Sequence, residues 1–295
     1  MTFIPTHEVR NSGRRLPPWF KVTMRQGQDY QDVRRIMDRL ELHTICEEAR
    51  CPNVWECWNN RTATFLILGD ICTRRCHYCA VTTGRPLELD REEPLRVAQA
   101  VEALSLRHAV ITSVNRDELE DGGAAIFAET IRQIRRLTPI CAVEVLIPDF
   151  EGNEAALALV VVEKPDILNH NIETVRRLFP SIRPQGKYDR SLTLLERAKR
   201  MGARTKSGLI VGMGETAEEV REVMRDLRAV ACDMMTIGQY LQPTKQHLPV
   251  ARFYHPDEFA AFKAEGLALG FSHVESGPLV RSSYHAEQQT SLPHA

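Results

Sequence analysis

The feature that most restricts the fold is a regular alternation of short apolar runs with helical patterns, which begins at Ala63. The predicted strands are residues 63–68, 108–113, 142–147, 167–169, 204–211 and 234–238. The predicted helices are residues 94–104, 122–137, 153–163, 191–201, 217–229 and 256–269. Strand–helix units that all run in one direction imply a parallel sheet, and the nearly continuous apolar strands fit burial on both faces.

Six such units favour an α/β fold of the partial (β/α)6 TIM-type barrel class, open on one side because it is short of the usual eight units. An open doubly wound sheet is the alternative, since periodicity alone does not separate the two. In a parallel barrel the carboxyl ends of the strands form the reactive face. Polar residues stand at these ends: Gly69 and Asp70, Thr112 and Ser113, Glu144, residues 169–171, Lys206 and Ser207, and residues 238–242.

The predicted barrel, residues 63–269, has an extension on each side. Residues 1–62 form an N-terminal extension with one amphipathic stretch, residues 30–42, and little strand pattern. Residues 270–295 form a C-terminal tail, which we expect to be too polar and too rich in turn residues to extend the core.

Charge and hydropathy exclude several classes of function. The 38 basic and 39 acidic residues nearly cancel, so no overall field attracts the chain to nucleic acid. The longest apolar run, residues 155–162, is far shorter than the roughly 20 residues of a membrane-spanning helix. We therefore expect a cytoplasmic protein that binds neither nucleic acid nor membrane, and we expect a monomer.

Six of the eight cysteines fall into two close triplets, which are Cys46, Cys51 and Cys57, then Cys72, Cys76 and Cys79. In a reducing cytosol, thiols at such short spacings are more often metal ligands than disulfides. A zinc ion would need a fourth ligand, and His77 would be strained in that role because it adjoins Cys76. Three thiolates around a four-iron cluster instead leave one iron open.

The second triplet has the pattern Cys72-x3-Cys76-x2-Cys79 on the loop after the first predicted strand, with Tyr78 before its last cysteine. It resembles the radical S-adenosylmethionine superfamily. The resemblance implies a [4Fe-4S] cluster whose open iron chelates the amine and carboxylate of S-adenosylmethionine.

Polar residues at the strand ends are the candidate contacts of this cofactor. They are Tyr78, Ser113, Asn115, Asp117, Glu144, Asn169 and Asn171. An ordinary structural hydrogen bond is the alternative for each of them. The Asp121-Gly122-Gly123 segment resembles a glycine-rich motif of the superfamily, although a helix start capped by Asp121 would look the same. Residues 208–215 resemble the segment that packs against adenine, where glycine permits close approach.

The first triplet, together with the Arg281-Ser282-Ser283-Tyr284 motif, resembles the lipoyl synthase family. This resemblance implies that Cys46, Cys51 and Cys57 hold an auxiliary [4Fe-4S] cluster. Its fourth iron would take a serine oxygen, from Ser283 or else from Ser282. Oxygen is a weaker partner than thiolate for such a cluster, which suits a cluster that must come apart.

Other residues have simpler interpretations. Arg281 would close over the auxiliary cluster or bind an anion, with a surface ion pair as the alternative. Trp55 and Trp58 would pack around the cluster, and Cys141 and Cys232 would be small buried apolar groups. Three histidines, each more often structural than catalytic, have possible roles near the site: His43, His170 and His285.

The resemblance implies a sulfur-inserting enzyme. An unactivated carbon of a fatty chain has no acidic proton or leaving group, so acid–base catalysis does not open it, whereas a radical does. In the family's reaction, S-adenosylmethionine is split to a 5′-deoxyadenosyl radical, and the auxiliary cluster donates two sulfur atoms, at C6 and C8 of a protein-bound octanoyl-lysyl group.

The implied partners are octanoylated lipoyl-carrier domains or the H protein, and an electron donor such as ferredoxin or flavodoxin. We expect the carrier to dock near Arg14 and Arg15. Two other functions stay open, namely a radical enzyme that inserts sulfur into a different substrate and a two-cluster electron carrier. The serine motif disfavours the first, and a carrier needs neither six strand–helix units nor open iron sites.

Overall fold

The computed structural model describes residues 16–22, 27–60, 62–284 and 286. The main sheet has eight strands: β1 (His43–Thr44), β2 (Thr64–Ile67), β5 (His108–Ser113), β6 (Ala142–Leu146), β7 (Ile167–Asn169), β8 (Thr205–Val211), β9 (Met234–Gln239) and β10 (His273–Gly277). They are ordered β1-β2-β5-β6-β7-β8-β9-β10. All neighbours are parallel except β1, which runs antiparallel to β2. Within the described ranges the edge strands β1 and β10 do not pair, so the barrel stays open.

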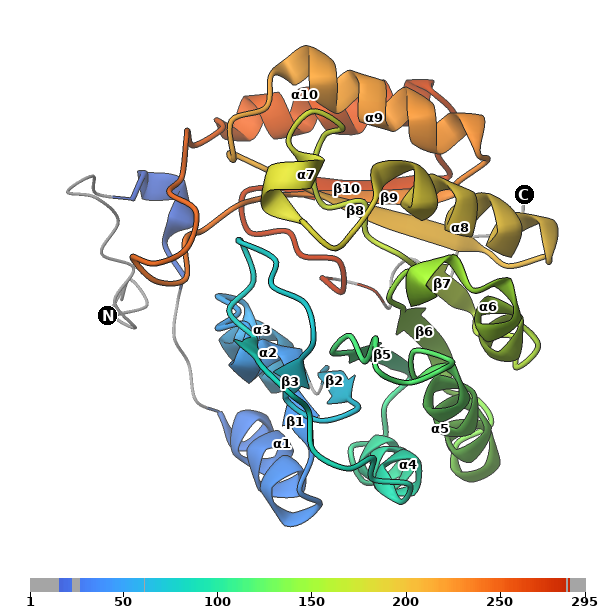
Figure 1. Cartoon of the computed structure of the whole chain (residues 1–295). Coiled ribbons are helices and arrows are strands. Elements are labelled where there is room, and N and C mark those ends of the chain that lie inside the picture. The colour runs from blue at the N-terminus through green and yellow to red at the C-terminus, as the bar shows by residue number, and fades with distance from the viewer. Residues whose placement is uncertain (1–15, 23–26, 61, 285, 287–295) are drawn as a thin grey trace.

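Helices surround the strands on the outside (Figure 1). They are α1 (Gln28–Arg39), α2 (Ile45–Glu48), α3 (Val54–Asn59), α4 (Glu93–Ala103), α5 (Ala124–Leu137), α6 (Glu154–Val161), α7 (Phe179–Ile182), α8 (Tyr188–Arg200), α9 (Ala217–Ala229) and α10 (Pro256–Ala268). Two short 3-10 helices lie at Pro18–Phe20 and Phe150–Gly152. In the described part of the chain, no helix has the length and apolar character that crossing a bilayer requires.

Local sequence explains where these helices begin. Thr216 and Glu219 form a reciprocal capping box at the start of α9, and Asn153 accepts a hydrogen bond from the Ala156 N–H at the start of α6. Each cap satisfies backbone donors that a helix end leaves free. The apolar strands then pack against the inner faces of the helices, and this burial supplies most of the stabilising free energy.

The predicted alternation is confirmed. The strands at 108–113 and 167–169 and the helix at 217–229 have the predicted bounds. The other predicted elements differ from the observed ones by at most three residues at either end. The strands follow each other around the sheet in chain order without the reversal of a doubly wound sheet, so the barrel class is correct and the alternative is wrong.

The described parts of both extensions contain more regular structure than predicted. The expectation that the tail does not extend the core is wrong, because β10 adds a parallel strand beside β9. The N-terminal extension contributes β1 to the sheet and two short helices, α2 with Cys46 and α3 with Cys57, while Cys51 lies between them. A two-stranded parallel ribbon, β3 (Ile71–Cys72) with β4 (Thr82–Thr83), frames the second triplet.

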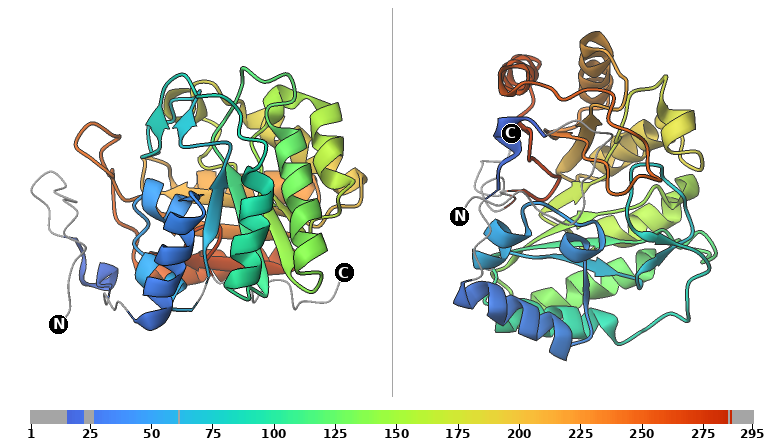
Figure 2. Two further views of the ribbon diagram at one scale, coloured as in Figure 1. Left: turned by 90° about the horizontal axis from the view of Figure 1, so that it is seen from below. Right: turned by 90° about the vertical axis from the view of Figure 1, so that its left-hand side faces the viewer.

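After β10 the tail crosses the open side of the barrel and returns to the N-terminal extension (Figure 2). Asn53 Nδ2 donates a hydrogen bond to the Leu279 carbonyl at 2.7 Å. The crossing passes close over β9 at Gly238, where a Cβ atom would stand only 2.1 Å from the Val280 carbonyl oxygen. A glycine is therefore required at that point.

Candidate functional site

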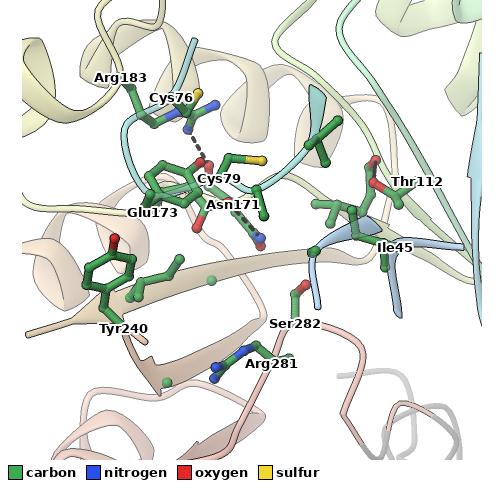
Figure 3. Close-up of a pocket in the computed structure, with 18 of the residues that line it drawn as sticks. Ile45, Cys76, Cys79, Thr112, Asn171, Glu173, Arg183, Tyr240, Arg281 and Ser282 are labelled. Carbon is green, nitrogen blue, oxygen red and sulfur yellow. Dashed lines mark hydrogen bonds between the residues drawn. The ribbon is translucent and has the colours of Figure 1, made fainter. Parts of the chain in front are cut away.

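A cavity of about 300 Å³ lies at the carboxyl ends of the strands. Its wall includes the loop after β2, the ends of β5, β8 and β9, part of the N-terminal extension and the tail. In Figure 3, Cys76 and Cys79 lie on one side of this cavity and Arg281 and Ser282 on the other, with Glu173 between them. The predicted reactive face is thus the place where the two extensions meet the barrel.

The second triplet is brought together as predicted, because Cys72, Cys76 and Cys79 all line the cavity. The backbone N–H groups of Arg74 and Asn115 donate to the Cys72 sulfur at 3.4 and 3.3 Å. Donors of this kind surround the sulfur ligands of iron–sulfur clusters, where they stabilise negative charge on sulfur. The loop therefore fits a cluster with three thiolate ligands.

Asp117 holds this loop and does not line the cavity. The Arg74 guanidinium is buried and lies 2.7 Å from an Asp117 oxygen and 2.6 Å from an Asp149 oxygen. Although burial disfavours the charge on Asp149, the Arg74 guanidinium holds the pKa of that carboxyl well below its usual range. The predicted contact of Asp117 with a cofactor is not supported, since its carboxylate is occupied by the loop's own arginine.

The first triplet is folded by backbone hydrogen bonds within the extension. The Cys51 N–H donates to the Cys46 carbonyl at 2.9 Å, and the Cys57 N–H donates to the Asn53 carbonyl at 2.9 Å. Cys46 is buried, and the other two cysteines of the triplet are partly buried. Trp55 stacks on the ring of Tyr30 with centroids 4.9 Å apart, which packs the extension beside the first triplet, and the packing of Trp55 and Trp58 around a cluster stays a prediction.

All eight cysteines are free thiols, so the disulfide alternative has no support. Burial raises the pKa of Cys46 and of Cys79 to about 12, and it also raises the pKa of Cys51 and Cys76. Such thiols are neutral until a metal displaces their protons, so metal binding and deprotonation are coupled. The remaining two, Cys141 and Cys232, are fully buried at a distance from the cavity, as predicted.

The zinc alternative is also not supported. Across residues 16–22, 27–60, 62–284 and 286, no three His, Cys, Asp or Glu side chains converge closely enough to hold a single ion. Thiolates that share a cluster of four irons stand farther apart than thiolates around one zinc, so this finding leaves the cluster interpretation intact. His77 is exposed and does not line the cavity.

The tail places its two serines differently. Ser282 lines the cavity. Ser283 does not, and its Oγ accepts a hydrogen bond from Thr64 Oγ1 at 2.9 Å. The Thr64 backbone N–H in turn donates to the Cys46 sulfur. Both candidate serines therefore lie in one turn beside the first triplet, and only the alternate choice, Ser282, faces the cavity.

Arg281 lies on the cavity wall, and its Nη1 donates to the Val280 carbonyl at 2.7 Å. Burial lowers its pKa, while the negative charges of Cys51 and Glu173 oppose that shift. It has no ion-pair partner within 4 Å in the part of the chain that the structure describes, so the surface ion pair considered for it is not found.

Several polar atoms of the cavity wall are buried without a hydrogen-bond partner among the described residues. They are Ser113 Oγ, Asn115 Oδ1, Asn171 Oδ1 and Arg183 Nε. Buried polar atoms are almost always hydrogen-bonded, so these four point to a missing polar ligand. Amide oxygens suit an ammonium group and a guanidinium suits a carboxylate, which together match the amino-acid part of S-adenosylmethionine. Tyr78, a predicted contact, also lines this wall.

Glu173 and Arg183 are cavity residues that sequence reasoning missed. Asn171 joins them, because its Nδ2 donates to Glu173 at 3.1 Å and its carbonyl accepts from Arg183 Nη1 at 2.9 Å (Figure 3). Burial raises the pKa of Glu173, although the Arg183 charge opposes it. Glu173 carried a usable signal as a carboxylate four residues past β7, whereas Arg183 lies in a stretch without a predicted element.

Glu144 and Asn169 do not line the cavity. Both are fully buried inside the barrel, where Asn169 Nδ2 donates to Glu144 at 3.1 Å and Lys206 Nζ pairs with the same carboxylate at 2.9 Å. His108 Nε2 lies 3.5 Å from it. Their predicted contact with a cofactor is therefore not supported, and the structural alternative holds.

The two glycine-bearing segments singled out in the sequence, residues 121–123 and 208–215, have different roles in the structure. Asp121 accepts hydrogen bonds from the N–H groups of Gly123 and Ala125 at 2.9 and 2.7 Å, so its carboxylate binds the first turn of α5 as the capping interpretation expects, although the N-cap residue itself is Gly123. Gly208 lines the cavity, and a Cβ there would stand 2.5 Å from Asn171 Oδ1. The close approach expected of the second segment is therefore present.

His170 lines the cavity but is committed to the fold. Its Nδ1 lies 2.9 Å from the Ile147 carbonyl and its Nε2 lies 2.9 Å from Ser191 Oγ. Burial lowers its pKa to about 4, so the ring is neutral. His43 is partly buried and lies 3.6 Å from Glu48. His285, Arg14 and Arg15 lie outside the described residues.

Comparison with known proteins agrees with this geometry. A model of the radical SAM superfamily matches residues 66–227, and a model of the N-terminal domain of lipoyl synthase matches residues 6–51. The lipoyl synthase of Rubrobacter xylanophilus is 60% identical over 290 residues, covering 98% of this chain and 90% of its relative. The lipoyl synthase of Bacillus subtilis is 55% identical over 280 residues, covering 94% of each.

Solved structures share the fold. Methylornithine synthase aligns with a TM-score of 0.54 over 85% of this chain and 83% of its own, at 14% identity. The FeFe-hydrogenase maturase HydG from Carboxydothermus hydrogenoformans aligns with a TM-score of 0.55 over 77% of this chain and 65% of its own, at 15% identity. At such low identity these likenesses concern only the open barrel.

Proposed function

This chain belongs to the lipoyl synthase family of radical S-adenosylmethionine enzymes, and we propose the part that each of its site residues takes in that family's reaction. The enzyme inserts two sulfur atoms, at C6 and C8, into a protein-bound octanoyl-lysyl group. Its cofactors are S-adenosylmethionine and two [4Fe-4S] clusters. When bound, these groups supply the radical and the sulfur, while the protein positions them and excludes water.

Cys72, Cys76 and Cys79 would hold the cluster that binds S-adenosylmethionine, and the first triplet would hold the auxiliary cluster. The observation that carries this assignment is the shared cavity. The three thiols of the second triplet line one part of it, while Ile45 and Pro52, which adjoin members of the first triplet, line another. A substrate chain in this cavity would reach both centres.

Arg183 would bind the carboxylate of S-adenosylmethionine, and the amide oxygens of Asn115 and Asn171 would accept hydrogen bonds from its ammonium group. Ser113 Oγ and the Glu173 carboxylate would take the remaining donors. This assignment is supported by the four unpartnered polar atoms of the wall, because each would gain the partner that it lacks. Tyr78 would pack beside the cofactor.

One of the two tail serines would give the auxiliary cluster its oxygen ligand. Ser283 is the choice from the family motif, and its hydrogen bond to Thr64 keeps it beside Cys46. Ser282 is the alternate, supported by its place on the cavity wall. Arg281 would balance the negative charge of the first triplet, since Cys51 raises its pKa against the effect of burial.

The enzyme acts on lipoyl-carrier proteins. We further propose that the carrier is an octanoylated lipoyl domain or the H protein, and that the reductant is a ferredoxin or flavodoxin. We propose a cytosolic location, because the reducing cytosol suits clusters that depend on reduced thiols. We also propose that the enzyme is a monomer. Three functional parts would be the extension 1–62, the barrel 63–269 and the tail 270–295, with β10 joining the tail to the barrel sheet.

Iron analysis of anaerobically reconstituted variants tests the two-centre assignment. Two clusters give about eight irons per chain, so Cys76→Ala and Cys51→Ala should each fall to about four. Only Cys76→Ala should abolish cleavage of S-adenosylmethionine to 5′-deoxyadenosine, whereas Cys51→Ala should keep cleavage and lose sulfur insertion into an octanoyl-lysyl peptide. Cys141→Ala is the matched control and should retain all the iron. A Cys51→Ala protein that keeps the full iron content would refute the assignment.

Parallel Ser282→Ala and Ser283→Ala variants decide between the two serines. The ligand variant should change the electron paramagnetic resonance spectrum of the reduced auxiliary cluster and lose its iron faster to a chelator. The other variant should match wild type in both measurements. If neither variant differed from wild type in its spectrum or in its rate of iron loss, an oxygen ligand from this turn would be contradicted.

A further inference from the structure

Three segments of this nearly neutral chain contain no acidic residue. They are residues 71–87, 174–188 and 240–256, and together they carry nine Lys and Arg residues and no Asp or Glu. The whole chain has 38 basic and 39 acidic residues, so this separation of charge is local. A local field of one sign is a physical basis for recognising a partner of the opposite sign.

Hydrogen bonds join the first two segments beside the second cysteine triplet. The Arg75 N–H donates to Gln185 Oε1 at 3.3 Å, and the His77 N–H donates to the Ile182 carbonyl at 3.0 Å. The segment after α7 is therefore fixed against the cysteine loop, with Lys187 only two residues beyond Gln185.

The third segment is fixed against the same loop. The Leu248 N–H donates to the His77 carbonyl at 3.2 Å, and His247 Nε2 lies 2.9 Å from the Cys79 carbonyl. The other nitrogen of His247 lies 2.8 Å from Thr244 Oγ1, which orients the ring. Lys245 stands between Thr244 and His247, so it too lies next to the cysteine loop.

Arg75, Lys187 and Lys245 are exposed, and we call these three side chains the basic rim. In the described residues none of the three has an acidic partner within 4 Å. Four of the other six basic residues of the same segments are paired, namely Arg74 with Asp117 and Asp149, Arg176 with Asp189, Arg177 with Glu219, and Arg252 with Glu258. The charge of the rim is therefore available to a partner.

The basic rim faces solvent and not the cavity. None of its three side chains lines the cavity, whereas Cys76, the neighbour of Arg75, does. The cysteine loop thus presents thiols to the inside and positive charge to the outside. A partner bound to the rim would come close to the second triplet without entering the substrate cavity.

From this placement we propose that the basic rim is the docking surface for an acidic one-electron carrier protein, which reduces the cluster held by the second triplet. The proposal rests on the function assigned above. In this step the reduced carrier loses one electron and the cluster gains it, with no proton or group transferred. Charge complementarity would speed the encounter and orient the donor toward the loop.

The octanoylated carrier is the other macromolecule that must reach this enzyme, and the rim suits it less well. An acyl-lysyl arm has to enter the cavity, so its carrier must cover the cavity mouth. An electron donor needs only to approach the cluster. The separation of the rim from the cavity lining therefore favours the electron donor.

Charge reversal of the rim tests the proposal. We expect the triple variant Arg75→Glu/Lys187→Glu/Lys245→Glu to bind an oxidised FMN flavodoxin about tenfold or more weakly at low salt, as titration calorimetry would measure. The affinity of the wild-type holoenzyme should fall as salt rises, and the variant should lose most of this salt dependence. Reduction of the cluster by reduced flavodoxin should slow in parallel.

A matched control reverses three exposed charges elsewhere, in the variant Arg107→Glu/Arg136→Glu/Lys164→Glu. These residues precede strands or end α5, at the opposite end of the barrel from the cysteine loop. The control should bind flavodoxin as wild type does. Both triple variants should keep wild-type iron content and wild-type cleavage of S-adenosylmethionine with reduced methyl viologen as the small-molecule reductant.

The outcomes separate this inference from the proposed function. Equal flavodoxin affinity in the rim variant and wild type would overturn the docking proposal. So would a rim variant that binds flavodoxin normally but binds an octanoylated lipoyl domain more weakly, since the rim would then serve the substrate carrier. If the wild-type enzyme did not cleave S-adenosylmethionine with reduced methyl viologen, that result would instead count against the proposed function.

Discussion

At the scale of single residues, the ion pair between Glu144 and Lys206 lies entirely inside the barrel, with 2.9 Å between its charged atoms. Removing one partner of such a pair leaves an unpaired charge in the core. We expect Glu144→Gln to lower the free energy of unfolding by about 3–5 kcal/mol, and Lys206→Met to have a similar effect. Urea unfolding followed by circular dichroism measures both.

The double variant completes a thermodynamic cycle. Because it removes both charges, we expect it to be more stable than either single variant, which requires a coupling energy larger than either single loss of about 3–5 kcal/mol. Purely additive losses would show that the two side chains do not interact. If Glu144 were instead a contact of S-adenosylmethionine, Glu144→Gln would weaken cofactor binding and leave the unfolding free energy nearly unchanged.

The pH dependence of stability gives the same pair a second signature. Burial alone would raise the pKa of Glu144, but the charge of Lys206 and the contacts with His108 and Lys206 together outweigh burial and lower the pKa from 4.5 to about 2. A carboxyl with a depressed pKa in the folded state stabilises the protein above its unfolded pKa, and this contribution is lost as pH falls through the folded pKa. Wild type should therefore lose stability between about pH 4.5 and pH 2, and Glu144→Gln should lack that component.

At the scale of elements, sequence periodicity predicted the barrel because its strands are buried on both faces and its helices on one. The tail strand β10 escaped prediction because it lies at an edge. Its polar residues have partners there, since Ser276 Oγ donates to the Phe259 carbonyl at 2.8 Å and Glu275 lies 3.4 Å from Lys263. A strand stabilised in this way carries no apolar run.

The candidate site was predictable in residue type but not in depth. Glu144 lies two residues before the end of β6, so its side chain is one layer below the rim of the barrel. Asn169 ends β7 and points to Glu144, whereas Asn171, two residues further along, reaches the cavity. Sequence alone shows that polar residues stand near strand ends, but the depth of each one depends on the register between strands.

The crossing of the tail over β9 gives a prediction at the same scale. At Gly238 a Cβ would lie 2.1 Å from the Val280 carbonyl oxygen, which belongs to backbone and cannot rotate away. We expect Gly238→Ala to displace the tail, and with it the serine that supports the auxiliary cluster. Iron content after reconstitution should fall from about eight toward about four per chain.

Gly277→Ala is the matched control for this prediction. Its Cβ would lie 3.2 Å from Val280 Cγ2, which is the end of a side chain that can adjust. This variant should keep most of its auxiliary iron. Equal loss in both variants would mean that any added methyl group near the tail is harmful, and it would remove the specific role assigned to the crossing.

At the scale of the whole molecule, contacts between residues far apart in the sequence hold the C-terminal tail across the open side of the barrel. Asn53 holds the Leu279 carbonyl, and Thr64 holds Ser283, across 226 and 219 residues of sequence. Nothing in a local pattern predicts such pairs, because each partner alone is an ordinary polar residue in an irregular segment. The resemblance to a family assigned functions to both ends without showing how they meet.

Thr64 is the residue at which the attachment of the tail can be tested most selectively. Its backbone N–H contacts Cys46 and its hydroxyl contacts Ser283, so Thr64→Val removes only the hydroxyl contact and keeps the shape of the side chain. The loss of one hydrogen bond costs about 0.5–1.5 kcal/mol, which would raise the open population of the tail by about twofold to tenfold. Trypsin should then cleave after Arg281 faster by a similar factor, as mass spectrometry of a time course would show. Thr64→Ser should restore slow cleavage, and a Thr64→Val protein as resistant as wild type would show that other contacts hold the tail in place.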